Sequence, residues 1–144
     1  MIAEPTDPHD LQRFVDAQER NYDQALAELR AGEKRSHWMW YVFPQYEGLG
    51  RSPMARQFAI RSVAEAEAYL RDPILGQRLR ECAEAVLAVE GRSAHDIFGS
   101  PDDFKLRSCA TLFSRVAPAG SPFQRILDRF FAGEPDPRTL QLIA

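Results

Sequence analysis

Cysteine and histidine are scarce in this sequence, and their scarcity excludes several classes of protein. Among 144 residues there are two cysteines and three histidines. Cys82 and Cys109 stand far apart and form no C-x-x-C pair, which argues against a disulfide framework and favours small buried thiols. The histidines, His9, His37 and His95, are scattered and form no H-E-x-x-H pattern. We therefore predict no metal site, and no motif implies a cofactor.

Long hydrophobic runs are also missing. No stretch of about 18 consecutive apolar residues occurs, so no membrane-spanning helix is predicted. The N-terminal segment, MIAEPTDPHD, is acidic and polar, unlike the basic and then apolar start of a secretory signal. These two absences predict a cytoplasmic protein without a membrane partner.

Patterns typical of β-strands hardly appear, whereas apolar residues recur at helical spacing along most of the chain. The first such segment predicts a helix over 10–31, ended by Gly32. No linker, repeat or low-complexity segment divides the chain, and its length suits one core. We predict an all-α fold, a single compact multihelical array of about seven helices over 10–144, with no significant sheet and a flexible tail over 1–9.

Helix starts are marked repeatedly by Ser or Asp followed by proline, which suit the N-cap and the first helical position. The pairs are Ser52-Pro53, Asp72-Pro73, Ser100-Pro101, Ser121-Pro122 and Asp136-Pro137. Ser62 with Glu65 matches the spacing of a capping box. Two apolar stripes follow, made by Leu75, Leu79, Cys82, Val86 and Val89 and by Leu106, Cys109, Ala110, Phe113 and Ala117. Both cysteines are therefore expected in the core.

The most unusual stretch is 36–52, SHWMWYVFPQYEGLGRS, which is rich in aromatic residues. Its first part predicts a short helix ended by Pro44, buried on several sides because it is apolar nearly all round. The ring nitrogens of His37, Trp38 and Trp40 then need partners. One interpretation is a core helix in which His37 is a satisfied core or capping residue. The other is a site where a tryptophan stacks on a planar ligand and His37 has an acid/base role.

Two further groups of polar residues allow a structural and a functional interpretation. Gln18 falls in the middle of the apolar stripe of the first helix, one turn before Tyr22. These side chains either tie that helix to the aromatic run by internal hydrogen bonds or line a pocket. Lys105, Ser108 and Thr111 form a polar face on the helix that follows residue 101, which is either solvated or turned toward a ligand.

The glycine loop that ends the aromatic stretch has the composition of an anion site. Gly48, Gly50, Arg51 and Ser52 bring backbone amides, a guanidinium and a hydroxyl to a helix N-terminus, where proteins hold phosphate or carboxylate groups. The spacing is not that of a P-loop, so a plain loop with a serine cap is the alternative. Segment 34–62 has five basic residues and one acidic residue in a chain of net charge −3. This local excess favours a small anion over a nucleic acid polymer.

Several motifs together resemble the bacterial domain-of-unknown-function 1810 family, sometimes labelled calpastatin-like. They are S-H-W-M-W-Y-V-F-P-Q with G-L-G-R-S in the aromatic stretch, E-A-x-A-Y-L-x-x-P-x-L-G-x-R-L over 65–79, I-F-G at 97–99, K-L-x-S-x-x-T-L-F over 105–113 and F-F-x-G-x-x-D near the end. The resemblance covers nearly the whole chain, from about residue 11 to 142. It implies an all-helical single domain and no established activity. The polar and glycine residues among its motif positions favour a ligand site.

A looser likeness connects the chain with all-helical N-glycosidases that act on ADP-ribose or on phosphorylated riboflavin intermediates. It rests on the tryptophan-rich helix, a glutamine and the A-Y-L-x-x-P-x-L-G pattern, and it matches no catalytic carboxylate. No catalytic residue is therefore assigned, and whether the protein is an enzyme stays open.

The leading hypothesis is binding of an anionic nucleotide-like small molecule, with N-glycosidic or ADP-ribose-related hydrolysis as its extension. The alternative is a non-enzymatic protein-interaction module in which the aromatic run serves only as core. The first hypothesis predicts a pocket between the first helix, the aromatic run, the glycine loop and the helix containing Lys105. Its expected ligand-binding residues are Gln18, Tyr22, His37, Trp38, Trp40, Gln45, Gly48, Gly50, Arg51, Ser52, Lys105, Ser108 and Thr111.

Overall fold

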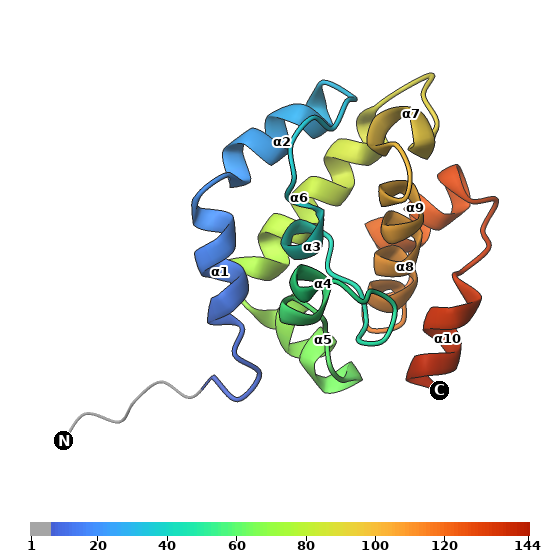
Figure 1. The fold of residues 1–144 in the computed structure, drawn as a ribbon. Helices are drawn as coiled ribbons and strands as arrows, with labels where there is room; N and C mark the ends of the chain where they lie inside the picture. The colour runs from blue at the N-terminus through green and yellow to red at the C-terminus, as the bar shows by residue number, and fades with distance from the viewer. Residues whose placement is uncertain (1–6) are drawn as a thin grey trace.

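The computed structural model describes residues 7–144, and this part of the chain is all-α (Figure 1). It contains no strand, and its only extended pairing is an isolated bridge between Tyr46 and Ile60. Ten helices occur in residues 7–144, more than the seven or so expected. They are α1 (Gln12–Glu19), α2 (Tyr22–Arg30), α3 (Met39–Val42), α4 (Pro53–Gln57), α5 (Val63–Arg71), α6 (Leu75–Ala88), α7 (Ala94–Phe98), α8 (Asp102–Ser114), α9 (Pro122–Phe130) and α10 (Pro137–Ile143).

The count differs partly because the single helix predicted over 10–31 is two helices, and that prediction was wrong. α1 ends at Glu19, and Asn21 leaves the helical conformation with φ −152° before α2 begins. The Asn21 Nδ2 donates to the Tyr41 hydroxyl at 2.7 Å, so its side chain bonds to another element. Asparagine competes with helical bonding in this way, a preference that the apolar periodicity does not show.

Serine and aspartate caps begin the helices at most of the predicted places. The Oγ atoms of Ser52, Ser62 and Ser121 accept from the backbone N–H three residues on, at 3.1, 3.0 and 3.3 Å. Asp136 accepts from the Thr139 N–H at 2.9 Å. These bonds satisfy amides that a helix start leaves without an intrahelical partner.

Three expected helix starts differ in detail. Asp72 ends α5 and is not the N-cap of α6, which begins at Leu75 and not at Pro73. Ser100 does not cap α8, because its hydroxyl donates to the Asp103 carboxylate at 3.1 Å and Pro101 holds the N-cap position. Glu65 does not complete a capping box, because its carboxylate pairs with Arg13 at 2.8 Å. The capping box that does form lies in α7, between Ser93 and Asp96.

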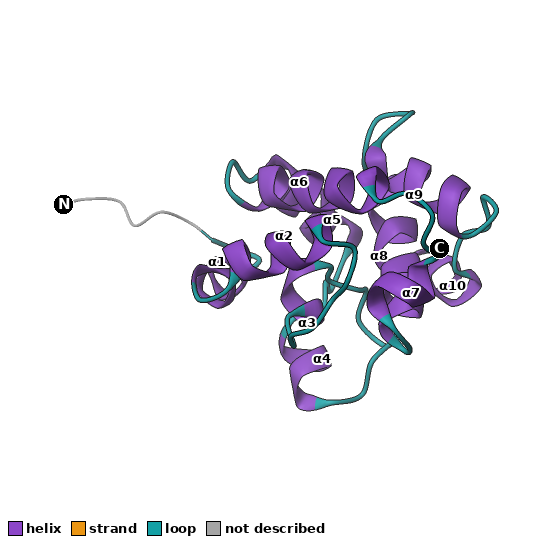
Figure 2. Ribbon diagram, turned by 90° about the horizontal axis from the view of Figure 1, so that it is seen from above, coloured by secondary structure: helices purple, strands orange, loops and turns teal. Residues whose placement is uncertain are grey.

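The core lies where α5, α6, α8 and α9 meet, and both predicted stripes contribute to it. α9 packs against α6 and α8, and α5 packs against α6 and α8, so these helices share one interior. In the stripe of α6, Leu75, Leu79, Cys82 and Val86 are buried, whereas Val89 lies beyond the helix end and is half-buried. Seen from above (Figure 2), α6 and α9 lie on one side of the molecule and α3 and α4 on the other. The aromatic stretch therefore lies on the side opposite α6, with Trp38 and Phe43 buried in the core.

The N-terminal tail expected over 1–9 lies mostly outside the described residues. From residue 7 onward the chain contacts the fold, because the Asp7 carboxylate accepts from the backbone N–H groups of Leu11 at 2.8 Å and Gln12 at 3.0 Å. Across the described residues, no helix combines the length and the apolar character that crossing a membrane requires.

Candidate functional site

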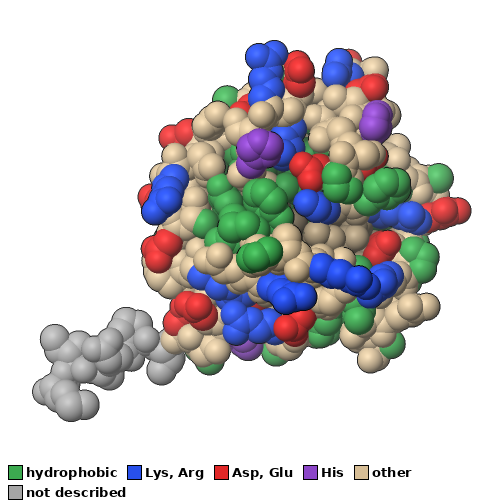
Figure 3. Space-filling model, viewed as in Figure 1, with side chains coloured by type: hydrophobic (Ala, Val, Ile, Leu, Met, Phe, Trp, Pro, Cys, Tyr) green, Lys and Arg blue, Asp and Glu red, His purple; other side chains and the backbone are tan. Residues whose placement is uncertain are grey.

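A groove of about 340 Å³ lies between the glycine loop, the first turns of α8 and the start of α10. Residues from three separate segments line it: Gln45, Leu49, Gly50, Pro101, Phe104, Lys105, Ser108, Asp136 and Arg138. Gln45, Gly50, Lys105 and Ser108 belong to the predicted ligand-binding set. Figure 3 shows this face, where Lys and Arg side chains lie around a hollow beside a patch of exposed hydrophobic side chains.

Backbone hydrogen bonds fix the start of the glycine loop. The Glu47 N–H donates to the Ile60 carbonyl at 2.8 Å, and the Ile60 N–H donates to the Gln45 carbonyl at 2.9 Å. Gly48 has φ +99°, a conformation that favours glycine. Its carbonyl accepts from the Arg138 guanidinium at 3.3 Å, which connects the loop to α10. Gly50 packs so closely that an added Cβ would lie 2.5 Å from the Ala55 Cβ.

Two lysines near the groove share one carboxylate. The Asp102 Oδ1 lies 3.2 Å from the Lys105 Nζ, and its Oδ2 lies 3.0 Å from the Lys34 Nζ. Each ammonium also lies over a tryptophan ring, Lys105 at 5.3 Å from the Trp40 centroid and Lys34 at 5.1 Å from the Trp38 centroid. One aspartate therefore neutralises only half of the positive charge, and each ring adds a cation–π attraction.

The hydroxyls expected to face a ligand bond within the protein. Ser108 Oγ donates to the Phe104 carbonyl at 3.1 Å, one turn earlier in α8. Thr111 Oγ1 donates to the Arg107 carbonyl at 2.8 Å and accepts from the Asp136 N–H at 2.8 Å, which connects α8 to α10. Thr111 is fully buried, whereas Ser108 retains an acceptor lone pair at the groove.

Gln18 and Tyr22 lie away from the groove and make internal bonds. Gln18 Nε2 donates to the Tyr41 carbonyl at 2.7 Å and to the Tyr69 hydroxyl at 3.2 Å, and Gln18 and Tyr22 also line a separate pocket of about 330 Å³. The Tyr22 hydroxyl donates to the Glu81 carboxylate. Burial, together with this hydrogen bond, raises the pKa of Tyr22 well above its ordinary value.

The remaining predicted residues divide between the interior and the open surface. Trp38 is fully buried, and Trp40 is half-buried beneath Lys105. His37 and Arg51 are exposed, and the structure shows neither of them lining the groove. Ser52 is engaged as the cap of α4.

A buried carboxylate that sequence analysis missed organises the start of the aromatic stretch. Glu28 is 9% exposed, and its Oε1 accepts from the Arg35 N–H at 2.7 Å and the Trp38 Nε1–H at 2.9 Å. Its Oε2 accepts from the Ser36 hydroxyl at 2.6 Å. Burial alone would raise the pKa of Glu28, but these hydrogen bonds to the ionised form lower it to about 2. A signal was available, because Glu28 stands one helical turn after Ala25 and beside Leu29 on the buried face of its helix.

The sequence of residues 8–143 matches the family model described as "Protein of unknown function (DUF1810)". The chain belongs to this family. Among solved structures it is similar to the conserved hypothetical protein Rv1873 from Mycobacterium tuberculosis, with 51% sequence identity and a TM-score of 0.93. That similarity covers 95% of this chain and 98% of the mycobacterial chain, so both have the same fold throughout. The search of curated proteins finds no match.

Proposed function

We propose that the groove binds a small anionic molecule with a planar apolar part, such as a nucleotide. The observation that supports this most is the placement of two cations, Lys105 on α8 and Arg138 on α10, in the lining of one groove. They come from segments far apart in the chain and lie together with the Gln45 amide and the Gly50 backbone. Arginine and lysine are the usual partners of phosphate and carboxylate groups.

The charge balance of the groove favours an anion. Asp102 is shared by Lys34 and Lys105, which leaves a net positive charge among these three groups. The other nearby carboxylate, Asp136, accepts from the Thr139 N–H at 2.9 Å and from the Thr139 Oγ1–H at 2.6 Å. It is therefore committed to the start of α10. A ligand anion would balance the excess positive charge of the two lysines and Arg138.

The planar part of the ligand is assigned to Phe104. Its side chain is 62% exposed although it is large and apolar, and it lines the groove beside Lys105. Trp38 cannot take this role because it is fully buried and bonded to Glu28. An aromatic ring can stack on a nucleobase regardless of its identity, so this contact would give affinity without strict base selectivity.

Hydrolysis is not part of the proposal, because Asp102 and Asp136 both have other partners and neither is a free general base. Hydrolysis in this groove would need a catalytic group other than these two carboxylates. We therefore make the release of free nucleobase a measured outcome in the experiment that tests binding.

The test compares AMP and ADP-ribose with uncharged adenosine by calorimetry and thermal shift, using wild type, Lys105→Gln and Arg138→Gln. The matched control is Arg71→Gln, since Arg71 is exposed and makes only a 3.9 Å surface ion pair with Glu67. A ligand at about 100 times its dissociation constant adds roughly 2.7 kcal/mol to stability. We expect each groove variant to weaken AMP binding about tenfold or more, and the control to leave it unchanged.

Three outcomes would count against the proposal. Equal binding of AMP and adenosine would remove the role of the anion, and equal affinity in Lys105→Gln and wild type would place the site elsewhere. Absence of any shift with every compound would favour the alternative, a protein-interaction module in which the buried Trp38, Met39, Val42 and Phe43 are only core. Chromatography of the same mixtures measures nucleobase release.

A further inference from the structure

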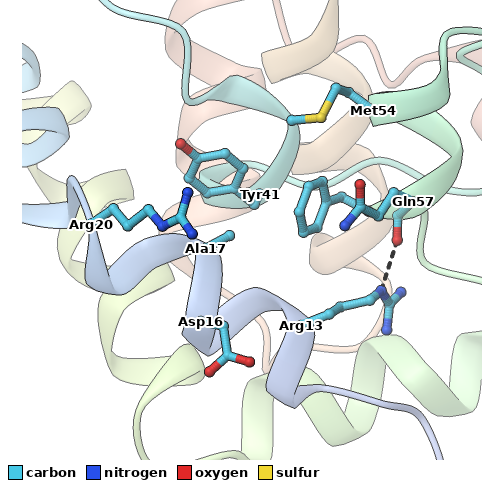
Figure 4. A pocket seen from close by; sticks show the side chains of 8 residues that line it. Arg13, Asp16, Ala17, Arg20, Tyr41, Met54 and Gln57 are labelled. Atoms are coloured by element: carbon cyan, nitrogen blue, oxygen red, sulfur yellow. Dashed lines mark hydrogen bonds between the residues drawn. The ribbon is translucent and has the colours of Figure 1, made fainter.

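A second pocket, of about 450 Å³, opens on the other side of the aromatic helix, between α1, α3 and α4 (Figure 4). Its lining is Arg13, Asp16, Ala17, Arg20, Tyr41, Met54, Gln57 and Phe58. The volume lies within the range of about 300 to 1,000 Å³ that is usual for small-molecule sites. None of these residues lines the groove described above.

The apolar part of this pocket is built from ring and sulfur surfaces. Tyr41 and Phe58 form a tilted aromatic pair with centroids 5.3 Å apart. The thioether of Met54 and the methyl group of Ala17 point toward the same space (Figure 4). Both rings are themselves well packed, so they offer a rigid surface, and methionine adapts its shape to an aromatic partner. This wall suits a flat apolar molecule.

The polar part of the pocket offers one uncommitted cation. Arg13 is engaged, because it pairs with Glu65 at 2.8 Å and donates to the carbonyls of Gln57 and Ala59 at 2.8 and 2.7 Å. Asp16 accepts from Gln12 Nε2 at 2.9 Å, and its carboxylate points away from the pocket. Arg20 has no hydrogen bond or ion pair from its guanidinium to residues 7–144, and it lies at the rim near Tyr41.

We propose that this pocket binds a small aromatic carboxylate, with the ring between Met54 and the Tyr41–Phe58 pair and the carboxylate on Arg20. The Arg20 guanidinium can hold a carboxylate through two parallel hydrogen bonds, whereas the Arg13 guanidinium is engaged and the Gln57 amide has no forked pair of donors. Glu65 neutralises Arg13, and the Asp16 carboxylate is bonded to Gln12 and turned away, so Arg20 is the cation that faces a singly charged ligand. This inference does not depend on the groove or on its proposed nucleotide.

The experiment titrates the full chain with 2-naphthoate and follows the Met54 methyl signal by NMR, assigned through Met54→Leu. We expect a saturable shift, with a weaker one for uncharged 2-naphthalenemethanol. Arg20→Gln should weaken naphthoate binding about tenfold, because a hydrogen bond to a charged group is lost. Ala17→Leu should abolish binding by filling the pocket. The matched controls are Arg30→Gln and Ala27→Leu on α2, both at exposed positions, which should bind as wild type does.

Arg20 is exposed, so its replacement tests the ligand contact even where Ala17→Leu fails to fold. The proposal is overturned by the absence of a saturable shift at millimolar naphthoate, or by equal affinity in Arg20→Gln and wild type. It is also overturned if Lys105→Gln in the groove removes the shift while Arg20→Gln does not. Loss of AMP binding in the groove variants, with naphthoate binding retained, would support two separate and independent binding sites.

Discussion

At the scale of single residues, the Glu28 carboxylate accepts four hydrogen bonds from the start of the aromatic stretch and the residues before it. Its two oxygens accept from one indole, one hydroxyl and the backbone amides of Arg35 and Ser36. These donors belong to the segment that leads from α2 into α3. The ionised carboxylate thus holds this segment and the fully buried Trp38 in place, since charge-assisted hydrogen bonds are stronger than neutral ones.

Glu28→Gln should lower the melting temperature at neutral pH and cost much less at acidic pH. Replacing an ionised acceptor by an amide weakens several hydrogen bonds at once, so we expect a loss of about 2 kcal/mol or more. The pKa of Glu28 is about 2 in the fold against an ordinary 4.5, so its contribution is complete above pH 4.5 and is lost as the pH falls toward 2. Thermal unfolding measured at about pH 7 and about pH 3 checks this.

The matched control is Glu33→Gln, whose side chain is 55% exposed and pairs only with exposed Arg35. It should change the melting temperature little at either pH, because exposed ion pairs add little stability. A deficit in Glu28→Gln that is as large at acidic as at neutral pH would contradict the prediction. Such a result would mean that shape, and not charge, is what the site requires.

The individual roles of the site residues could be predicted only where local spacing determines them. The caps at Ser52 and Asp136 follow from the residue type and the proline after it, and both form. By contrast, the i,i+3 spacing of Asp102 and Lys105 in α8 is local, but nothing local indicates that Lys34, from a separate segment, shares the same carboxylate. The same holds for Arg138, whose place in the groove depends on where α10 lies.

At the scale of elements, Arg13 connects α1 to two other helices. It donates to the Gln57 carbonyl at the end of α4, to the Ala59 carbonyl and to the Glu65 carboxylate in α5. The side chains of Arg13 and Glu65 are only 8% and 2% exposed. A buried pair of this kind is costly to break from one side, because it leaves a charge without its partner.

A double-mutant cycle with Arg13→Met and Glu65→Gln should show unequal single effects. Arg13→Met leaves the Glu65 carboxylate without its partner and removes the guanidinium hydrogen bonds to four backbone carbonyls, so we expect a loss of about 3 to 5 kcal/mol. Glu65→Gln should cost less, because Arg13 keeps its carbonyl acceptors. The double variant should be little worse than Arg13→Met alone, with a coupling energy of about 1 to 3 kcal/mol from urea unfolding.

The surface pair of Arg71 and Glu67, 3.9 Å apart in α5, serves as the control cycle. Its coupling energy should lie near zero because both side chains are exposed. Additive effects for Arg13 and Glu65 would contradict the prediction. They would show that α1 is held by its apolar contacts, such as Phe14 against Tyr69 with centroids 5.1 Å apart, and not by the ion pair.

The helices themselves were predicted best where periodicity and caps agree. α9 follows the Ser121-Pro122 pair and begins at Pro122 as expected, whereas α6 has a continuous apolar stripe but begins at Leu75 and not at Pro73. The first predicted helix had the same periodicity, but it breaks at Asn21 because the amide bonds to Tyr41 across the fold. Periodicity reports which face is buried and not whether the axis continues, so short connected helices merge in a sequence-based count.

At the scale of the whole molecule, the two buried cysteines can be used to test whether the core unfolds as one cooperative unit. Cys82 on α6 is 0% exposed and Cys109 on α8 is 1% exposed. Burial raises the pKa of the Cys82 thiol to about 12 and also raises that of Cys109 well above its ordinary value. Because the thiolate is the reactive form, neither cysteine should react in the native fold. Chemical modification of either thiol therefore requires local or global unfolding that exposes the core.

α6 and α8 are joined through common neighbours, since both pack against α5 and both pack against α9. An opening that exposes one helix face would therefore remove the support of the other. We expect Cys82 and Cys109 to be modified by a thiol reagent at equal rates, with the same dependence on urea, as in a single cooperative transition. Mass spectrometry of the two cysteine-containing peptides measures both rates in one sample.

A faster reaction at one cysteine would show that its helix opens separately, and the molecule would then contain two cooperative units. Ligand binding adds a second, independent check. AMP or naphthoate at saturation stabilises only the native state, so it should slow both reactions by the same factor if opening is global. Slowing at one cysteine alone would mean that its helix opens locally and that the ligand holds only that part of the core.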